Sequence, residues 1–201
     1  SVRSTTLPTG LRLIPFKGAA NFRDLGGYPA GDGNYVAWRR IYRSDSLAEL
    51  TDGDHDIWRG LGIRVVCDLR IFSERSNAPD RLPPEKYLEE CHIGFLPAGA
   101  NEMLRAVRGG ELTSTAIVAE VIRHYRRLPL DHLDEYRQIF SLLGAAQNQP
   151  LVIHCTSGKD RTGFAAMLIL LALGVSEELA LEDYLLTNAY RRDVSHIFNL
   201  H

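Results

Sequence analysis

The segment 150–174, PLVIHCTSGKDRTGFAAMLILLALG, limits what this chain can fold into more than any other stretch. It begins with a short β-branched apolar run and ends with an apolar run of helical length that closes on Gly174. Between these runs, residues 154–163 bring a histidine, a cysteine, glycine, two cations and a carboxylate into one turn. We therefore predict a buried strand over 150–154, a polar loop, and a helix over 162–173.

The rest of the chain alternates between strand-like and helix-like segments. The predicted elements are strands over 34–44, 63–69 and 86–96, helices over 51–62, 113–128, 131–147 and 176–190, and a proline-broken loop over 71–85. Such alternation predicts an α/β fold with a central, mostly parallel sheet flanked by helices. We expect a single domain over residues 1–201, with an N-terminal arm over 1–20.

Composition argues against several classes of function. The 201 residues carry a formal net charge of −2, which does not favour nucleic acid as a partner. No apolar run reaches the length of a membrane span, and three cysteines do not make a disulfide framework. We therefore expect a cytoplasmic protein with no integral membrane segment, and we leave export from the cell open.

The loop after residue 154 lies where parallel α/β sheets bind ligands, beyond the carboxyl ends of the strands. Cys155 would stand at the mouth of a helix, where backbone N–H groups attract an anion and favour a thiolate over a thiol. Gly158 lets the backbone curl tightly, and Arg161 presents a planar fork that can hold two phosphoryl oxygens. Thr162 can stabilise the sulfur as a leaving group. These residues predict a phosphate-binding loop over a cysteine nucleophile.

Other residues of this loop have alternative interpretations. Thr156 and Ser157 would offer backbone N–H groups to a phosphate. Lys159 either contacts the substrate or lies in solvent outside the site. Asp160 is either the general acid or a structural cap and partner for a cation such as Lys159. His154 points to the opposite face of the strand from the nucleophile, and we predict that it supports the loop as a buried hydrogen-bonding group.

Three motifs together resemble a known family. HCTSGKDRTG (154–163) resembles the signature of cysteine-dependent protein tyrosine phosphatases, and more narrowly that of the bacterial branch with the secreted mycobacterial and listerial enzymes. NFRDLGGY (21–28), DLR (68–70) and ER (74–75) resemble the other motifs of that branch, in the same order. The resemblance spans roughly residues 20–190. It implies a tyrosine-phosphatase-like fold, catalysis without a metal or cofactor, and a phosphocysteine intermediate.

The same resemblance bears on the general acid and the substrate. Many tyrosine phosphatases use an Asp on a separate mobile loop, but the corresponding segment here, 94–102, contains no Asp. Asp160 is therefore our preferred acid, and its position is also similar to that in phosphoinositide phosphatases of the myotubularin type. Lys159 is similar to the cationic loop of lipid phosphatases. Phosphotyrosine, phosphoserine or phosphothreonine, and phosphoinositides all remain open as substrates. A helical insertion over 100–130 is predicted to form a lid.

Polar residues outside the loop are candidates for supporting it. Asn21 and Asp24 precede the Gly26-Gly27 pair, and they either brace the phosphate loop or bond their own backbone turn. Asp68 and Arg70 end a strand near the predicted site, where an ion pair that braces the sheet edge is the expected role of each.

Three functions compete on the sequence alone. The leading hypothesis is a metal-independent phosphatase for phosphorylated proteins or phosphoinositides, with phosphate or another oxyanion in the loop. A rhodanese-type sulfurtransferase fits the Lys-Asp-Arg-Thr run less well, and a non-catalytic phosphate-binding module would not need both Cys155 and Arg161. No Cys/His cluster has the spacing of a zinc site, so no metal ligands are assigned.

Overall fold

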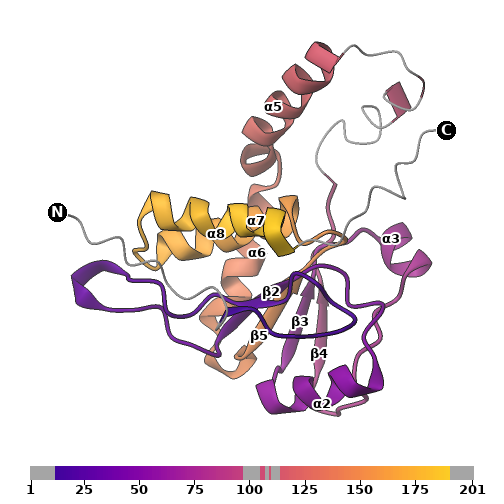
Figure 1. The fold of residues 1–201 in the computed structure, drawn as a ribbon, viewed down its shortest axis with the longest axis vertical. Helices are drawn as coiled ribbons and strands as arrows, with labels where there is room; N and C mark the ends of the chain where they lie inside the picture. The colour runs from indigo at the N-terminus through magenta and orange to yellow at the C-terminus, as the bar shows by residue number, and fades with distance from the viewer. Residues whose placement is uncertain (1–11, 97–104, 107–108, 110–113, 191–201) are drawn as a thin grey trace.

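A computed structural model describes residues 12–96, 105–106, 109 and 114–190 of the chain. In these residues a five-stranded sheet is flanked by helices, as Figure 1 shows. The predicted α/β fold class is confirmed.

The bounds of the described strands, α-helices and 3-10 turns are as follows. The strands are β1 (Arg23–Asp24), β2 (Ile41–Ser44), β3 (Val65–Asp68), β4 (Glu89–His92) and β5 (Leu151–His154). The α-helices are α2 (Asp52–Leu61), α3 (Phe72–Asn77), α5 (Ser114–Asp131), α6 (Leu133–Gly144), α7 (Asp160–Ala172) and α8 (Glu177–Tyr190). Two short 3-10 turns are η1 (Gly31–Gly33) and η2 (Ala146–Asn148).

The strand order β1-β2-β5-β3-β4 places β5 at the centre of the sheet. β5 runs parallel to both β2 and β3, β4 runs parallel to β3, and β1 alone is antiparallel, to β2. In register, the last residue of β5, His154, pairs with Ser44 of β2 and with Asp68 of β3. The carboxyl ends of three neighbouring strands therefore meet at one edge, which is the edge where α/β sheets bind ligands.

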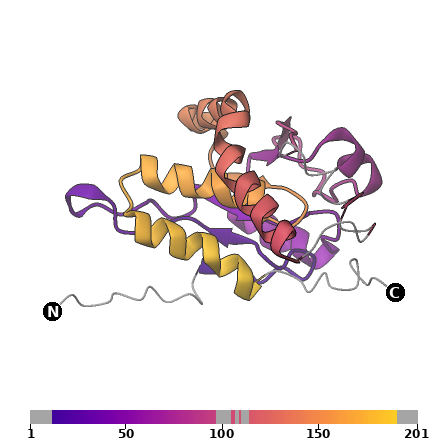
Figure 2. The same ribbon diagram turned by 90° about the horizontal axis from the view of Figure 1, so that it is seen from above.

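Alternate residues of the buried strands face two separate apolar cores. The core under α6, α7 and α8 receives Val65, Cys67, Leu151 and Ile153 from β3 and β5. The opposite core, which α2 covers, receives Val66 and Val152. Figure 2 shows α7 and α8 lying side by side on their face of the sheet. Both faces are covered, which explains why β3 and β5 are continuous apolar runs rather than alternating ones.

The N-terminal segment contributes to the second core. Phe16 stacks on Phe22 with a centroid distance of 4.4 Å, and the edge of Trp58 from α2 meets Phe22 at 6.1 Å. Residues 1–11 of the predicted arm lie outside the described residues. The part of the arm around Phe16 is buried in the second core.

The predicted loop over 71–85 is partly wrong, because it contains α3. The Glu74 carboxylate accepts the backbone N–H of Ile71 at 2.9 Å and closes the first turn of this helix. All three prolines of the segment, at 79, 83 and 84, lie beyond its last residue. A helix of six residues can therefore form before the chain reaches the residues that prevent one.

Other predicted boundaries shift by a few residues. The strand predicted over 34–44 is reduced to β2, because Arg39 adopts a left-handed φ of 58° and interrupts the extended run. The strand predicted over 86–96 contracts to β4, and the helix predicted from residue 162 begins at Asp160. The Thr51 hydroxyl caps α2, and the Ser176 hydroxyl accepts a backbone N–H from the first turn of α8.

Helix α5 extends away from the sheet in Figure 1. Its C-terminal half is anchored by Leu128, which is buried in the core under α6 and α7. Residues 100–104, 107–108 and 110–113 of the predicted lid lie outside the described residues, so the lid stays a prediction. Of the helices that the structure describes, none combines the length and apolarity needed to cross a bilayer.

We expect Thr51→Ala to destabilise the protein by about 1 kcal/mol, because it removes one half of a reciprocal cap. The Thr51 hydroxyl accepts the Asp54 N–H at 3.2 Å, and the Asp54 carboxylate accepts the Thr51 N–H at 2.8 Å. Urea unfolding measures the change. Ser141→Ala is the control, since this exposed hydroxyl bonds only a carbonyl of its own helix. Equal midpoints for the two variants would contradict the capping account.

Candidate active site

Cys155 directly follows β5 and is almost completely buried. The segments that follow the neighbouring strands β2 and β3 fix the start of the loop. The N–H of Leu69, beyond β3, donates to the His154 carbonyl at 2.9 Å, and the N–H of Ser46, beyond β2, donates to the Thr156 carbonyl at 3.1 Å. The cysteine therefore leaves the sheet edge in a defined direction, with little freedom to move.

Gly158 forms the tight turn of the loop. Its φ of +61° lies in the left-handed region that favours glycine. A Cβ atom built on Gly158 would lie 2.5 Å from the Ser44 carbonyl oxygen and 2.7 Å from the Asp45 nitrogen. The loop therefore presses against the end of β2 at a distance that only glycine permits.

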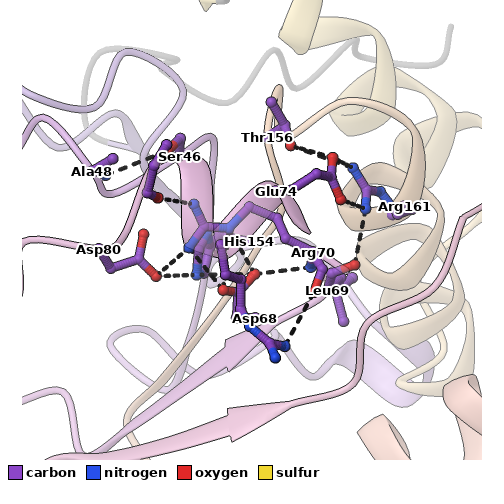
Figure 3. Close-up of polar contacts among 12 residues, drawn as sticks. Ser46, Ala48, Asp68, Leu69, Arg70, Glu74, Asp80, His154, Thr156 and Arg161 are labelled. Carbon is purple, nitrogen blue, oxygen red and sulfur yellow. Dashed lines mark hydrogen bonds and ion pairs between the residues drawn. The ribbon is translucent and has the colours of Figure 1, made fainter. Parts of the chain in front are cut away.

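Arg161, on the first turn of α7, is held by a carboxylate from α3 (Figure 3). Its Nη1 and Nη2 atoms donate to the two oxygens of Glu74, each at 2.7 Å. Nη1 also donates to the carbonyls of Leu69 and Phe95, at 3.0 and 3.1 Å. The Thr156 hydroxyl donates to Glu74 Oε1 at 2.6 Å. A planar, two-pronged contact of this kind fixes the orientation of the guanidinium as well as its position.

The charge state of Glu74 follows from these contacts. Burial raises its pKa, but hydrogen bonds from Arg161 and Thr156 outweigh burial and lower the pKa from 4.5 to about 2. Desolvation of Arg161 likewise opposes its charge, and the hydrogen bond with Glu74 more than offsets it, so that the pKa of Arg161 is raised. Both groups are therefore ionised at neutral pH, and the pair is a permanent part of the site.

Asp160 is the first residue of α7 and faces α5. The Tyr125 hydroxyl of α5 donates to Asp160 Oδ1, and Lys159 Nζ lies 3.7 Å from the same oxygen. Lys159 Nζ also lies 5.9 Å from the centre of the Tyr125 ring. Burial, followed by the hydrogen bond to Asp160, raises the pKa of Tyr125. Lys159 is thus the cationic neighbour that the structural interpretation of Asp160 predicted. The role of Asp160 as general acid stays a prediction.

His154 is completely buried, as predicted, and belongs to an ion-pair network on the β3 side of the loop (Figure 3). Arg70 Nη2 lies 2.8 Å from Asp68 and 2.7 Å from Asp80, which confirms an ion pair for both Asp68 and Arg70. His154 Nε2 lies 3.1 Å from Asp80 Oδ2. Neither ring nitrogen meets hydrogen-bond geometry within the described residues, so the hydrogen-bonding role of His154 stays a prediction.

Asp68, Asp80 and His154 place three potential metal-ligating atoms within 4.8 Å of one another. Arg70 lies against both carboxylates and supplies a positive charge there. The chemistry of this cluster is therefore that of a buried ion pair.

The two polar residues of the N-terminal motif take different roles. Asn21 Nδ2 donates to the Gly158 carbonyl at 3.2 Å, so this residue contacts the phosphate loop. Asp24 instead accepts the backbone N–H groups of Gly26 and Arg39, at 2.7 and 2.8 Å. The structure therefore gives Asn21 the bracing geometry and Asp24 the geometry of a turn.

The remaining predicted residues lie where the sequence placed them along the loop. Thr156 and Ser157 are exposed at its mouth. Thr162 is completely buried, and its hydroxyl has no hydrogen-bond partner among the described residues, so its proposed contact with the sulfur stays a prediction. Residues 97–102, in the segment compared with a mobile acid loop, lie outside the described residues.

Several residues of the site carried no predicted role. Glu74 was part of a quoted motif without a function, and Tyr125, Asp80, Arg43 and Asp183 were not singled out. One signal was available for Asp183, because it shares the inner, buried face of α8 with Ala180 and Thr187 at spacings of three and four residues. A charged residue on such a face requires a buried partner.

The fold and the loop define a class of protein: an α/β domain that presents a cysteine and an arginine around a glycine turn at the carboxyl edge of a parallel sheet. The profile of the tyrosine phosphatase family matches residues 14–200, and the chain therefore belongs to this family. The resemblance drawn from the three sequence motifs is confirmed at the level of the family.

Two curated relatives agree with this assignment. The chain is 33% identical over 186 residues to a candidate tyrosine-protein phosphatase of Cupriavidus necator, covering 89% of this chain and 64% of the relative. It is 30% identical over 203 residues to the triple specificity protein phosphatase PtpB of Mycobacterium tuberculosis, covering 89% of this chain and 69% of the relative. The solved core catalytic domain of the PP-IP phosphatase SIW14 from S. cerevisiae, in complex with citrate, is 15% identical to this chain, with a TM-score of 0.47. The match covers 92% of this chain and 85% of the solved chain. The chain spans about two thirds of the length of these two curated relatives.

We expect Glu74→Gln to destabilise the protein at pH 7 by about 1.5–3 kcal/mol, the cost of a lost hydrogen bond to a charged group. The pKa of Glu74 is lower in the folded protein than its ordinary value, so its contribution is complete above about pH 4.5 and is lost as the pH falls toward 2. The difference between wild type and variant should therefore shrink in acid.

Urea unfolding at pH 7 and at pH 3 measures both effects. Glu182→Gln, an exposed change on α8, is the matched control and should alter neither value. A difference between wild type and Glu74→Gln that grows in acid would show that the Arg161–Glu74 pair does not carry the assigned energy.

Proposed function

We propose that this chain hydrolyses phosphate monoesters, with phosphotyrosine as the main substrate class, through a covalent phosphocysteine at Cys155. The observation that carries the proposal is the position of Cys155 directly after β5 and of Arg161 on the first turn of α7, on either side of the Gly158 turn, with Arg161 oriented by two hydrogen bonds to Glu74. Family membership, and relatives named as tyrosine-protein phosphatases, support the same reaction.

In the first step, the Cys155 thiolate attacks phosphorus while the bond from phosphorus to the leaving oxygen breaks. The phosphoryl oxygens are held by backbone N–H groups of the loop, from Thr156 to Thr162, and by Arg161. Within the described part of the chain, the hydrogen bonds of the Arg161 guanidinium run from Nη1 and Nη2. Its Nε–H is therefore the donor that we assign to the substrate, with Glu74 keeping the guanidinium plane fixed.

Asp160 is the proposed general acid. It would protonate the leaving phenolate oxygen in the first step and accept a proton from water in the second, when water attacks phosphorus and releases the thiolate. The Tyr125 hydroxyl and the Lys159 ammonium both neighbour its carboxylate. This arrangement leaves Asp160 partly exposed at the mouth of the loop, which is where a leaving group would lie.

A phosphoinositide is the second candidate substrate, because Lys159 lines an apolar groove of about 540 Å³ between α5, α7 and α8. Phe164, Met167, Leu181 and Leu185 supply the apolar lining. A cation beside an apolar groove suits a lipid phosphate better than it suits a short phosphopeptide. Neither a metal nor a cofactor has a part in the proposed reaction, and a cytoplasmic location and the absence of a nucleic-acid partner stay predictions from the sequence.

The first test is hydrolysis of p-nitrophenyl phosphate at about pH 6 in excess chelator, where a cysteine thiolate can be the nucleophile. We expect wild-type turnover to survive chelation and Cys155→Ser to abolish it. Cys91→Ser, at a half-buried cysteine outside the loop, is the matched control and should retain activity.

Equal turnover in wild type and Cys155→Ser would refute the proposed nucleophile. If the wild type hydrolyses no phosphate ester, thiosulfate turnover would indicate sulfur transfer. Phosphopeptide binding without turnover would instead indicate a binding module. A phosphotyrosine peptide and a phosphoinositide, compared at equal concentration, decide between the two substrate classes.

We expect Asp160→Asn to lower turnover of a phosphotyrosine peptide by about 10²- to 10⁴-fold, the usual contribution of a general acid, and to flatten the basic limb of the pH profile. Asp134→Asn, an exposed carboxylate on α6, is the control. Kinetics of Asp160→Asn that match the control would assign the acid to another group.

A further inference from the structure

Two arginines from the first two strands lie buried behind the phosphate loop. Arg23 of β1 and Arg43 of β2 pair in register, and both side chains are completely buried. A single carboxylate, Asp183 of α8, contacts both of them in the part of the chain that the structure describes. Arg43 Nη1 lies 2.7 Å from Asp183 Oδ2, and Arg23 Nε lies 3.3 Å from Asp183 Oδ1.

Arg43 reaches the loop directly. Its Nη2 atom donates to the Gly158 carbonyl at 2.8 Å, which is a shorter contact than the 3.2 Å bond from Asn21 to the same oxygen. Nη2 also donates to the Thr187 hydroxyl of α8 at 3.2 Å. Asp183 and Thr187 therefore hold the guanidinium that holds the Gly158 carbonyl.

The direction of this carbonyl matters for anion binding. In a planar trans peptide, the C=O of one residue and the N–H of the next point to opposite sides. When Arg43 holds the Gly158 carbonyl on the outer side of the loop, the N–H of Lys159 is turned toward the inside, where a phosphoryl oxygen would be bound. The left-handed φ of Gly158 makes this orientation accessible to the backbone.

The cluster also carries an excess of positive charge. Burial, followed by repulsion from Arg43, lowers the pKa of Arg23 to about 10, which still leaves it charged at neutral pH. Burial opposes the charge of Asp183, but Arg43 and Arg23 outweigh it and lower the pKa of Asp183. Two guanidinium charges thus face one carboxylate, and the field behind the loop favours a bound anion.

We infer that Arg43 and Asp183 are positioning residues of the active site, which set the orientation of the Gly158–Lys159 peptide and hold positive charge behind the phosphate loop. This inference rests on the proposed function and deepens it. The alternative is a purely structural role, in which the cluster only fixes α8 to the sheet. A Cβ on Gly163 would lie 2.7 Å from the Tyr184 ring and 3.1 Å from Arg43 Nη2, so α7 packs closely against both α8 and this guanidinium.

The two roles predict different behaviour of folded variants. Arg43→Gln and Asp183→Asn should lower kcat/KM for p-nitrophenyl phosphate, and should raise the inhibition constant of inorganic phosphate, each by about 10- to 100-fold. Arg43→Lys keeps the charge but lacks the two separate Nη groups that contact Asp183 and the Gly158 carbonyl, so it should recover only part of the loss. Measurements are made below the unfolding temperature of every variant, as shown by circular dichroism.

Ile63→Ala is the matched control. This completely buried residue precedes β3, at the end of the sheet away from the loop, and belongs to the second core. We expect it to lower stability while keeping wild-type kcat/KM and wild-type inhibition by phosphate. If Arg43→Gln and Asp183→Asn behave in the same way as Ile63→Ala, the cluster is structural and the inference is overturned.

Two further outcomes also decide the question. If Arg43→Gln does not fold, Thr187→Val and Arg43→Lys replace it, and wild-type inhibition by phosphate in both would overturn the inference. If the wild type has no hydrolytic activity, the proposed function fails. Calorimetric titration of phosphate into wild type and Arg43→Gln then tests the inference alone, with weaker binding in the variant supporting it and equal binding overturning it.

Discussion

The contact between Gly158 and the end of β2 is the constraint on which the site depends. No side chain larger than a hydrogen atom fits between the loop and the Ser44 carbonyl, 2.5 Å from where a Cβ would lie. The loop turns at this point, between Cys155 after the end of β5 and Arg161 on the first turn of α7. The parallel sheet makes the contact available, since β2 and β5 end side by side.

Two buried ion-pair networks flank this loop on opposite sides. On the β3 side, Arg70 lies between Asp68 and Asp80 and beside His154, the residue before the nucleophile. On the β2 side, Asp183 joins Arg23 and Arg43.

Buried charges of this kind are costly unless they are paired, so neither network can rearrange without a large penalty. The same penalty resists movement of the loop between them. Rigidity is useful in a site whose N–H groups must already face the anion before it binds. The Arg161–Glu74 pair adds the third fixed element, because it holds the Arg161 guanidinium from the side of α3.

The sequence was sufficient to predict the elements that local pattern determines. The strand–loop–helix at 150–174 follows from the hydrophobic pattern, and contact of Asn21 with the loop was one of two roles that its motif allowed. The chemical roles of Cys155 and Arg161 stay predictions, and the expected grip of the Arg161 fork on two phosphoryl oxygens is replaced by its contact with Glu74. Helix α3 was missed because prolines dominate its segment, although all of them follow the helix.

Contacts between residues that are far apart in the sequence could not be predicted from local pattern. Glu74 meets Arg161 across 87 positions, and Asp183 meets Arg43 across 140, so their pairing depends on the tertiary fold. Tyr125 reaches Asp160 because the fold brings this part of α5 to the first residue of α7, and nothing in its local sequence distinguishes it from other helical tyrosines.

The most direct test of this account is the chemical identity of the reaction intermediate. Wild-type protein mixed with a phosphotyrosine peptide is quenched in acid within one turnover and is then analysed by peptide mass spectrometry. The account predicts a phosphoryl group on the peptide that contains Cys155, absent in Cys155→Ser. Turnover without any adduct at Cys155, or an adduct on a different residue, would contradict it.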